Sequence, residues 1–502
     1  MNKSFSIYEI ADLNRSSLTS RDNYEYINYL DTSNLTRNKI ENIQYLDTNF
    51  PSRAKRKVKA DTILYSTVRP NQEHFGIVEN TNINNLIVST GFTTIDVKSN
   101  EINPKYLYYK LTNPVVTSYL QTIAENSVSA YPSIKPEEIG NLRFKFPVLK
   151  VQQKIAKVLS ALDDKIELNN QINAELEEMA KTLYDYWFVQ FDFPFDCAQG
   201  KPFDFGPIAS AQGPASQNGT VAEEHATIGD RHAPVAERHA PVADGYSPVA
   251  AEHAPVADQP LPVAERSRTV AERSRGYKSS GGKMVYNEVL KREIPEGWEV
   301  KRLHEIANIT MGQSPSGESY NEQKGGMIFF QGSTDFGWRF PENRIYTTSP
   351  TRFAKENDIL LSVRAPIGTM NIAMYDCCIG RGLSALNSKE NYNSFLIYQM
   401  NYFKKKFDYL NSVGTTFGSL TKDDLYNLEL CYPNKHILEK FEKIVSKFDA
   451  KIKINTKQNQ ELAQLRDWLL PMLMNGQVTV ASGEYEMEEG SLGMVAEEDE
   501  NY

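Results

Sequence analysis

A nine-residue stretch near the middle of the chain has the composition of a phosphate-binding loop. Residues 276–284 read GYKSSGGKM, with glycines and a lysine of the kind that surround phosphate oxygens. However, Gly282 stands where the lysine of such a loop belongs, and Met284 follows Lys283 where serine or threonine is required. No strand is expected before the stretch. It is therefore not predicted to bind a nucleotide.

Other catalytic motifs are absent from the sequence. There is no GxGxxG opening a βαβ unit, no HExxH and no GxSxG. Asn103-Pro104 and Asn113-Pro114 lack the second proline of the NPPY motif used by amino-methyltransferases. We therefore predict no catalytic residue and no cofactor bound by this chain.

Histidines and cysteines are the remaining candidates for metal chemistry. His232, His239 and His253 recur in one repetitive segment, where no cysteine or rigid scaffold accompanies them. The four cysteines are Cys197, Cys377, Cys378 and Cys431. They show no CxxC spacing, and an adjacent pair does not easily form a disulfide. We predict neither a metal site nor a disulfide framework.

Basic and amide side chains in both halves of the chain could bind a nucleic acid. Arginine and lysine contact phosphates, and glutamine, serine and threonine hydrogen-bond to base edges. The first half has a basic cluster just before an expected strand, which suits either a phosphate-contacting loop or an ordinary solvated loop. The second half has polar loops and a lysine triplet. The candidates are Arg53, Lys55, Arg56, Lys57, Lys59 and Arg69 in the first half, and Gln313, Ser314, Gln331, Ser333, Thr334, Arg339, Arg364, Lys404, Lys405 and Lys406 in the second. Internal salt bridges, ordinary turns and solvated helix faces are the alternatives.

The net charge of -9 does not exclude a polyanionic partner, because the negative charge is concentrated at one end. After Gly476 the chain contains eight aspartate and glutamate residues and no lysine or arginine. The rest of the chain is close to neutral. A nucleic-acid-binding body with an acidic tail remains possible.

Two long stretches are expected to position these side chains. Residues 151–188 carry apolar residues at alternating spacings of four and three, which indicates a helix with one narrow apolar seam. Shifted by 286 positions (441 minus 155), the seam returns in residues 441–473. The seam residues are Ile155, Leu159, Leu162, Ile166, Asn169, Asn173, Leu176 and Leu183 in the first stretch, and Phe441, Val445, Phe448, Ile452, Asn455, Asn459, Leu462 and Leu469 in the second.

Two asparagines fall at equivalent places in each seam. A buried asparagine lowers stability, but it fixes register and partner choice because it demands a hydrogen-bonding mate. We therefore expect the helices to pack antiparallel, with Asn169 and Asn173 facing Asn455 and Asn459. The alternative is that two ordinary amphipathic helices are buried in separate domains.

The regions before the two helices are also similar. EIANI at 305–309 matches EIADL at 9–13, and DILLSVRAP at 358–366 matches DTILYSTVRP at 61–70. NSVGTTFGSLTKDDL at 411–425 likewise matches residues 126–139. Strands are expected at 62–68 and 86–97 and a helix at 104–122. The chain is predicted to be a tandem duplication of a mixed globular domain followed by a long helix.

Residues 200–276 separate the two copies and contain almost no large apolar residues. From Arg231 they repeat with a period of seven, as in RHAPVAE and RHAPVAD. The recurring prolines, from Pro234 to Pro262, exclude a coiled coil because each would remove a helical hydrogen bond. We expect a disordered spacer here.

At 502 residues the chain can form two to four domains. No run is long and apolar enough to span a membrane, and the N-terminus MNKSFSIYEI lacks the apolar core of a signal peptide. A cytoplasmic protein without membrane association is expected.

Several of these segments resemble the specificity subunit of type I restriction-modification systems. They are IPEGWEVKRL at 294–303, DILLSVRAPIG at 358–368, the NSVGTTFGSLTKDDL run and LDDKIELNNQINAEL at 162–176. The resemblance implies an α+β fold with two similar target recognition domains. Two long helices, packed as an antiparallel coiled coil, separate these domains with an internal pseudo-two-fold.

The resemblance also implies function and partners. The subunit would be non-catalytic and would read a bipartite double-stranded DNA target. It would dock two methyltransferase subunits and, through them, restriction subunits that translocate DNA. S-adenosylmethionine, ATP and Mg would be bound by these partners and not by this chain. The alternatives are a coiled-coil scaffold that does not bind DNA and a stand-alone DNA endonuclease.

Changes in composition and the two long helices set the expected domain boundaries. They are 1–147 for the first recognition domain, 148–190 for the first spacer helix, 191–285 for a linker with the 200–276 insertion, 286–433 for the second recognition domain, 434–475 for the second spacer helix and 476–502 for an acidic disordered tail. The first domain lacks an IPEGW lead-in, so its N-terminal strand is expected to be short.

Overall fold

The computed structural model describes residues 3–19, 21–79, 84–127, 131–192, 283–412 and 419–480. They form two compact units, of which unit 1 comprises residues 1–179 and 445–502 and unit 2 residues 180–444. The heptad-repeat insertion with its three histidines, Cys197 and the acidic segment after residue 480 lie outside the described residues. Below, domain 1 denotes residues 3–146 and domain 2 residues 283–432.

Domain 1 is built around two four-stranded sheets. The first, β2-β11-β8-β9, is antiparallel throughout, and the second, β6-β3-β10-β7, contains one parallel pair, β3 with β10. Two short antiparallel pairs, β1-β12 and β4-β5, complete it. The strands are β1 Lys3–Ser6, β2 Ala11–Leu13, β3 Ile27–Leu30, β4 Leu35–Thr36, β5 Lys39–Ile40, β6 Gln44–Leu46, β7 Ala54–Lys57, β8 Ile63–Ser66, β9 Phe75–Ile77, β10 Leu86–Ser89, β11 Phe92–Val97 and β12 Arg143–Phe146.

Prolines begin three of the helices of domain 1. These helices are α2 (Pro104–Leu111), α3 (Pro114–Glu125) and α4 (Pro136–Gly140), and α1 (Ile7–Ile10) precedes them. The single helix expected over 104–122 is wrong, because Asn113 caps a new helix there by accepting a hydrogen bond from the Val115 amide. Pro114 has no amide hydrogen with which to continue α2.

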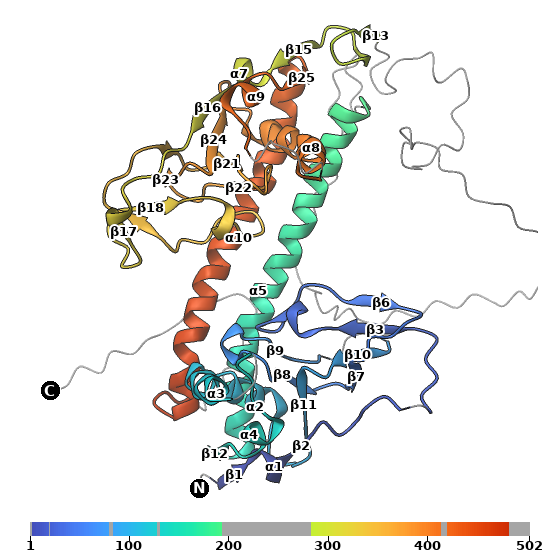
Figure 1. The fold of residues 1–502 in the computed structure, drawn as a ribbon, viewed down its shortest axis with the longest axis vertical. Helices are drawn as coiled ribbons and strands as arrows, with labels where there is room; N and C mark the ends of the chain where they lie inside the picture. The colour runs from blue at the N-terminus through green and yellow to red at the C-terminus, as the bar shows by residue number, and fades with distance from the viewer. Residues whose placement is uncertain are drawn as a thin grey trace, which may run out of the picture. The chain divides into compact units, whose positions relative to one another are not determined.

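The apolar core of domain 1 includes both long helices. Ile63 and Tyr65 of β8 belong to the same buried cluster as Leu159 of α5 and Leu473 of α10. Figure 1 shows the β8–β11 region beside the first half of α5. Burial of each large aliphatic side chain contributes about 1.5–3 kcal/mol to the free energy of folding, so contacts with the two long helices stabilise domain 1.

Domain 2 repeats this architecture. Its sheet β16-β24-β21-β22 is antiparallel like β2-β11-β8-β9, and its pair β15-β25 corresponds to β1-β12. A five-stranded sheet, β17-β19-β18-β23-β20, and the hairpin β13-β14 complete it. The strands are β13 Met284–Asn287, β14 Arg292–Pro295, β15 Glu299–Arg302, β16 Ala307–Met311, β17 Tyr320–Asn321, β18 Met327–Phe330, β19 Tyr346–Thr347, β20 Phe353–Ala354, β21 Ile359–Ser362, β22 Met370–Ile372, β23 Cys377–Ile379, β24 Leu383–Ser388 and β25 Glu429–Tyr432.

The first strand of domain 1 is short, as the missing lead-in predicts, but it is no shorter than its counterpart in domain 2. Both β1 and β15 contain four residues. Among the described residues, the lead-in of domain 2 forms the hairpin β13-β14, which ends at Pro295. The chain then turns at Gly297, whose φ is +86°. That positive φ favours glycine over residues with a Cβ atom.

The remaining helices complete the duplication. Domain 2 contains α7 (Leu303–Ile306), α8 (Asn393–Ser412) and α9 (Lys422–Tyr426). The two long helices are α5 (Leu149–Tyr184), which continues into the π-helical turn η3 (Asp185–Val189), and α10 (Lys435–Asn475). Two similar α+β domains and two long helices thus confirm the expected fold class.

Candidate nucleic-acid interface

The seam asparagines of α5 and α10 hydrogen-bond to one another within unit 1. Asn169 Nδ2 donates to Asn459 Oδ1 at 2.8 Å. Asn455 Nδ2 donates to Asn173 Oδ1 at 2.9 Å. A step of four residues forward on α5 therefore corresponds to a step of four back on α10, so the helices are antiparallel. Because each amide needs its mate, these pairs fix the register of the helices.

The other seam residues lie buried or half-buried along the helices. Val445 and Ile452 of α10 are fully buried, and Ile155 and Leu159 of α5 join the core of domain 1. Apolar contacts thus surround the two asparagine layers. Such layers are polar exceptions in an otherwise apolar seam.

Domain 2 packs on both long helices through aromatic side chains within unit 2. Trp187, at the end of the α5 segment, lies with its ring centroid 5.7 Å from that of Phe441 on α10. Phe395 of α8 contacts Tyr184 and Phe188, with ring centroids 6.0 and 5.0 Å apart. Edge-to-face aromatic contacts of this kind stabilise a packed interface.

The basic cluster of domain 1 lies on a strand, not in a loop. Residues 54–57 form β7, which pairs with β10, so the expectation of a loop before a strand is wrong. Lys57 forms an ion pair with Asp22, and the half-buried Arg56 donates to Ser17 Oγ at 3.0 Å. Burial lowers the pKa of the Arg56 guanidinium. Both side chains are therefore engaged within domain 1.

Three members of the cluster, one on β7 and two beside it, are exposed to solvent. Arg53, Lys55 and Lys59 are exposed. Arg69, which is half-buried, places its guanidinium carbon 5.2 Å from the ring centroid of Tyr131. The three exposed side chains keep their charges in solvent, where a phosphate can reach them.

In domain 2, three separate polar loops meet. Gln331 Nε2 donates to Ser314 Oγ at 2.8 Å, and the same hydroxyl oxygen accepts from the Arg381 amide at 3.2 Å. Gln313, Gln331 and Arg381 are exposed. This arrangement gathers donors and acceptors from three loops at one surface.

Glycines allow these loops to approach closely. A Cβ atom on Gly312 would lie 2.1 Å from the Gly380 carbonyl oxygen. Side chains at these positions would separate the loops that carry Gln313 and Arg381. Sequence reasoning missed Arg381, although the flanking glycines in GRG at 380–382 are a signal of close backbone approach.

Arg339 does not belong to this surface. It is only 6% exposed, and its Nη1 donates to the Tyr398 hydroxyl at 3.3 Å. Its guanidinium is therefore engaged inside domain 2, and DNA contact by Arg339 stays a prediction.

The remaining candidates of domain 2 lie on other elements. Ser333 and Thr334 begin the short helix η5 (Ser333–Asp335), where Thr334 is exposed and Ser333 half-buried. Arg364 is exposed after β21, and Lys404, Lys405 and Lys406 are exposed on α8. These residues remain candidates for phosphate contacts.

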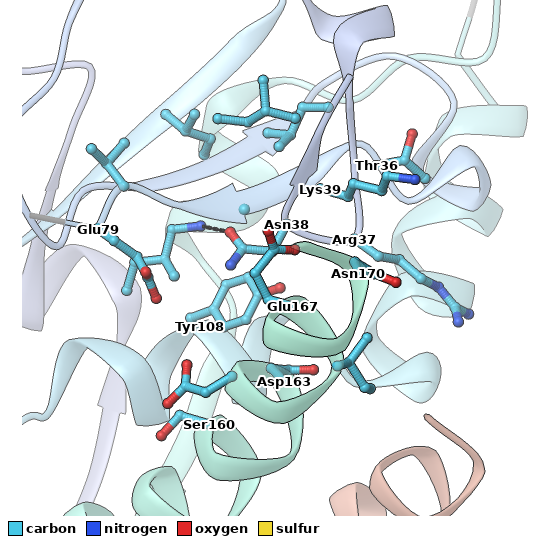
Figure 2. Close-up of a pocket in the computed structure, with 18 of the residues that line it drawn as sticks. Thr36, Arg37, Asn38, Lys39, Glu79, Tyr108, Ser160, Asp163, Glu167 and Asn170 are labelled. Atoms are coloured by element: carbon cyan, nitrogen blue, oxygen red, sulfur yellow. Dashed lines mark hydrogen bonds between the residues drawn. The ribbon is translucent and has the colours of Figure 1, made fainter. Parts of the chain in front are cut away.

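A groove of about 800 Å³ lies between domain 1 and α5. Figure 2 shows Arg37, Asn38 and Lys39 from the β4–β5 turn on one side and Asp163, Glu167 and Asn170 from α5 on the other. The groove therefore carries charges of both signs over an apolar floor. None of the candidate DNA-binding residues lines it.

Metal and membrane features are not found in the described ranges. No group of three or more histidine, cysteine, aspartate or glutamate residues there could hold a metal ion. Cys377, Cys378 and Cys431 are buried free thiols. No helix in the part of the chain that the structure describes has the length and hydropathy of a membrane span.

Two similar domains, each packed on a pair of antiparallel helices in fixed register, define a two-site binding protein. The chain belongs to the type I restriction modification DNA specificity domain family, whose sequence model matches residues 2–178 and 295–464. The first matched region covers domain 1 and part of α5, and the second covers domain 2 from residue 295 and part of α10. Recognition of DNA sequence is thus the function of this chain.

Individual relatives agree with this assignment. The chain is 27% identical over 449 residues to the type I restriction enzyme HindI specificity subunit of Haemophilus influenzae, covering 86% of this chain and 89% of that protein. It is 36% identical over 192 residues to a putative MjaX specificity subunit of Methanocaldococcus jannaschii, covering 38% of this chain and 45% of that relative. The fold is similar to that of a type I S subunit from M. genitalium, with a TM-score of 0.50 at 13% identity, over 94% of this chain and 96% of that one.

Proposed function

We propose that this chain is a non-catalytic specificity subunit that reads a bipartite DNA target. Domain 1 would read one half-site, domain 2 the other, and α5 and α10 would set the spacer between them. The duplication carries this proposal, because two similar domains on one helix pair suit a ligand with two similar sites along one axis. Duplex DNA offers such sites in successive segments of its major groove.

The polar surface of domain 2 suits base recognition. Arginine donates two hydrogen bonds to guanine, whereas glutamine donates one hydrogen bond to adenine N7 and accepts one from the adenine N6 amino group. Arg381 and Gln331 would supply these contacts, with Ser314 holding the Gln331 amide in place. The exposed Arg53, Lys55 and Lys59 of domain 1 would contact phosphates, which contribute affinity that falls with salt.

The helix pair offers two equivalent docking positions for a partner. Leu168 and Ile454 are related by the same 286-residue shift (454 minus 168), and they are 48% and 51% exposed. Two copies of a methyltransferase subunit would bind there, and restriction subunits would join through them. S-adenosylmethionine, ATP and Mg would be bound by those partners, and the complex would act in the cytoplasm.

The test is a selection and footprint with the full-length chain and its methyltransferase subunit on random duplex DNA. Two short protected patches separated by an indifferent spacer support the proposal. Cleavage by this chain alone would instead identify an endonuclease. If no DNA is protected even at low salt, the proposal is refuted and the chain is a protein-interaction scaffold.

Arg381→Gln tests the recognition surface of domain 2. Loss of one bidentate base contact weakens discrimination at one position by ~1–3 kcal/mol, roughly 5- to 150-fold. Lys355→Gln is the matched control, because it removes one exposed positive charge from the same domain, where Lys355 pairs with Asp376 at 2.8 Å. Equal effects of the two substitutions would show that Arg381 contributes only charge.

A further inference from the structure

Arg466 of α10 lies at the centre of a polar network in unit 1. Its Nη1 donates to Asp163 Oδ1 on α5 at 2.7 Å. Its Nε and Nη2 donate to Asp467 Oδ1 at 2.9 and 2.8 Å. The Arg466 side chain is 17% exposed, so the planar guanidinium is held between two carboxylates with little solvent access.

Domain 1 joins this network from two separate elements. Tyr109 of α2 donates its hydroxyl to Asp163 Oδ2 at 2.6 Å, so both oxygens of Asp163 are engaged. Arg37, in the β4–β5 turn, donates from Nη1 to Asp467 Oδ2 at 3.5 Å. Arg37 also pairs with Glu73 after η2 (Pro70–Gln72), where Nη2 and Oε1 are 3.0 Å apart. The network thus connects α2 and the β4–β5 turn to both long helices.

Arg466 and Tyr109 keep their protons in this network. Burial alone would lower the pKa of Arg466, but the hydrogen bond and charge of Asp163 raise it overall. Burial, and then the Asp163 charge, raise the pKa of Tyr109 well above its ordinary value. The guanidinium therefore stays charged and the phenol stays protonated, which keeps every donor in place.

Domain 2 has no copy of this arrangement at the equivalent position. The residue on α5 that corresponds to Arg466 is Ala180 (466 minus 286). Domain 2 contacts the helices through Tyr184, whose hydroxyl donates to Gln399 at 2.8 Å, and through the aromatic rings described above. Aromatic packing tolerates small rotations better than a charged network with fixed donor angles.

We propose that Arg466 is a positioning residue that sets the orientation of domain 1 on the helix pair, and thereby the spacer length that the protein accepts. This inference rests on the proposed bipartite recognition. A rotation or slide of domain 1 along the helices must separate Tyr109 from Asp163 and Arg37 from Asp467. Successive base pairs are ~3.4 Å apart, so a slide of that size would favour a neighbouring spacer length.

Half-sites and spacer are first selected with the wild-type complex on random duplex DNA. The experiment then measures the affinity of each variant complex for three duplexes that carry these half-sites, with the selected spacer or with a spacer one base pair shorter or longer. For Arg466→Met we expect the preference for the selected spacer to fall by roughly 5- to 150-fold, the range of coupling between interacting sites. Half-site sequences should stay unchanged. Arg466→Lys should restore only part of the preference, because its ammonium can still pair with Asp163 but lacks the planar pair of donors that holds Asp467.

Two further variants guard against a simple loss of folding. Tyr109→Phe removes only the hydroxyl donor and should give a smaller fall in the same direction, even if Arg466→Met does not fold. Lys3→Met is the control, because it breaks the Lys3–Glu101 pair, which joins residues of domain 1 only. Unchanged spacer preference in both Arg466→Met and Tyr109→Phe would overturn the inference. Failure of the wild-type complex to select two half-sites would overturn the proposed function instead.

Discussion

Replacement of Asn173 by alanine should weaken the helix pair by removing the mate of a buried amide. Asn455 is 1% exposed, its Oδ1 has no hydrogen-bond partner, and its Nδ2 donates to Asn173 Oδ1 at 2.9 Å. Asn173→Ala would leave both polar atoms of Asn455 buried without a partner. Such a group costs about 1–3 kcal/mol, and we expect the upper half of that range, about 2–3 kcal/mol.

Hydrogen exchange of peptides from residues 165–176 and 452–463 measures this effect locally, without assuming that the two units unfold together. A loss of about 2–3 kcal/mol corresponds to a fall in protection of roughly 30- to 150-fold. Asn455→Ala should give a similar fall. The two alanine substitutions together should cost less than the sum of the single effects, because both act on one hydrogen bond.

The double variant Asn173→Leu with Asn455→Leu separates stability from register. Replacement of both partners by apolar groups is near neutral or stabilising, so protection should remain close to wild type. The selected DNA spacer should nevertheless become less sharply defined, because one polar layer no longer fixes the register. Strict additivity of the alanine substitutions, or a sharp spacer in the leucine variant, would refute the reasoning.

Three other outcomes follow from the same structure. Matched seven-residue insertions in α5 and α10, on the domain 2 side of the asparagine layers, lengthen each helix by about 10 Å at ~1.5 Å per residue. Because base pairs are ~3.4 Å apart, a repeated selection should give a spacer longer by about three base pairs, with both half-sites unchanged. Leu168→Asp with Ile454→Asp should abolish co-purification of the methyltransferase subunit while unit 1 keeps its melting temperature. The hydrogen bond from Lys57, with support from Thr19, lowers the pKa of Asp22 to about 2, so its stabilising effect is complete above about pH 4 and is lost as the pH falls towards 2. The difference in melting temperature between wild type and Asp22→Asn should therefore be constant from pH 5 to 7 and shrink below pH 4.

The long helices and their seam could be predicted because helical periodicity is a local property of the sequence. The spacing of four and three identifies one face, and an asparagine on that face must find a partner. The break before α3 could also have been predicted, since Asn113-Pro114 is a cap followed by a residue that cannot continue a helix. The duplication was visible because both copies keep the same order of short motifs.

The candidate DNA-binding residues were harder to predict, because exposure depends on contacts that are distant in sequence. Arg339 and Arg381 each lie within two residues of a glycine, yet Arg339 is buried against Tyr398, 59 residues away, and Arg381 is exposed. The basic cluster was read as a loop because its charges obscured the strand. The buried Ala54 and exposed Lys55 begin β7, which strand pairing with β10 places in the second sheet.

The two copies share the asparagine residues of the long helices, but they differ in the contacts that join each domain to these helices. Tyr109 in YLYY of α2 and Tyr398 in FLIY of α8 occupy matching places, but Tyr109 donates to Asp163 on a long helix, whereas Tyr398 accepts from Arg339 within its own domain. The asparagine layers therefore serve both copies equally, while each domain is oriented by its own contacts. It follows that a domain transplanted onto the first position must bring partners for Asp163 and Asp467 if it is to keep the original spacer. A transplant that brings only apolar contacts would keep its half-site but lose the sharp spacing.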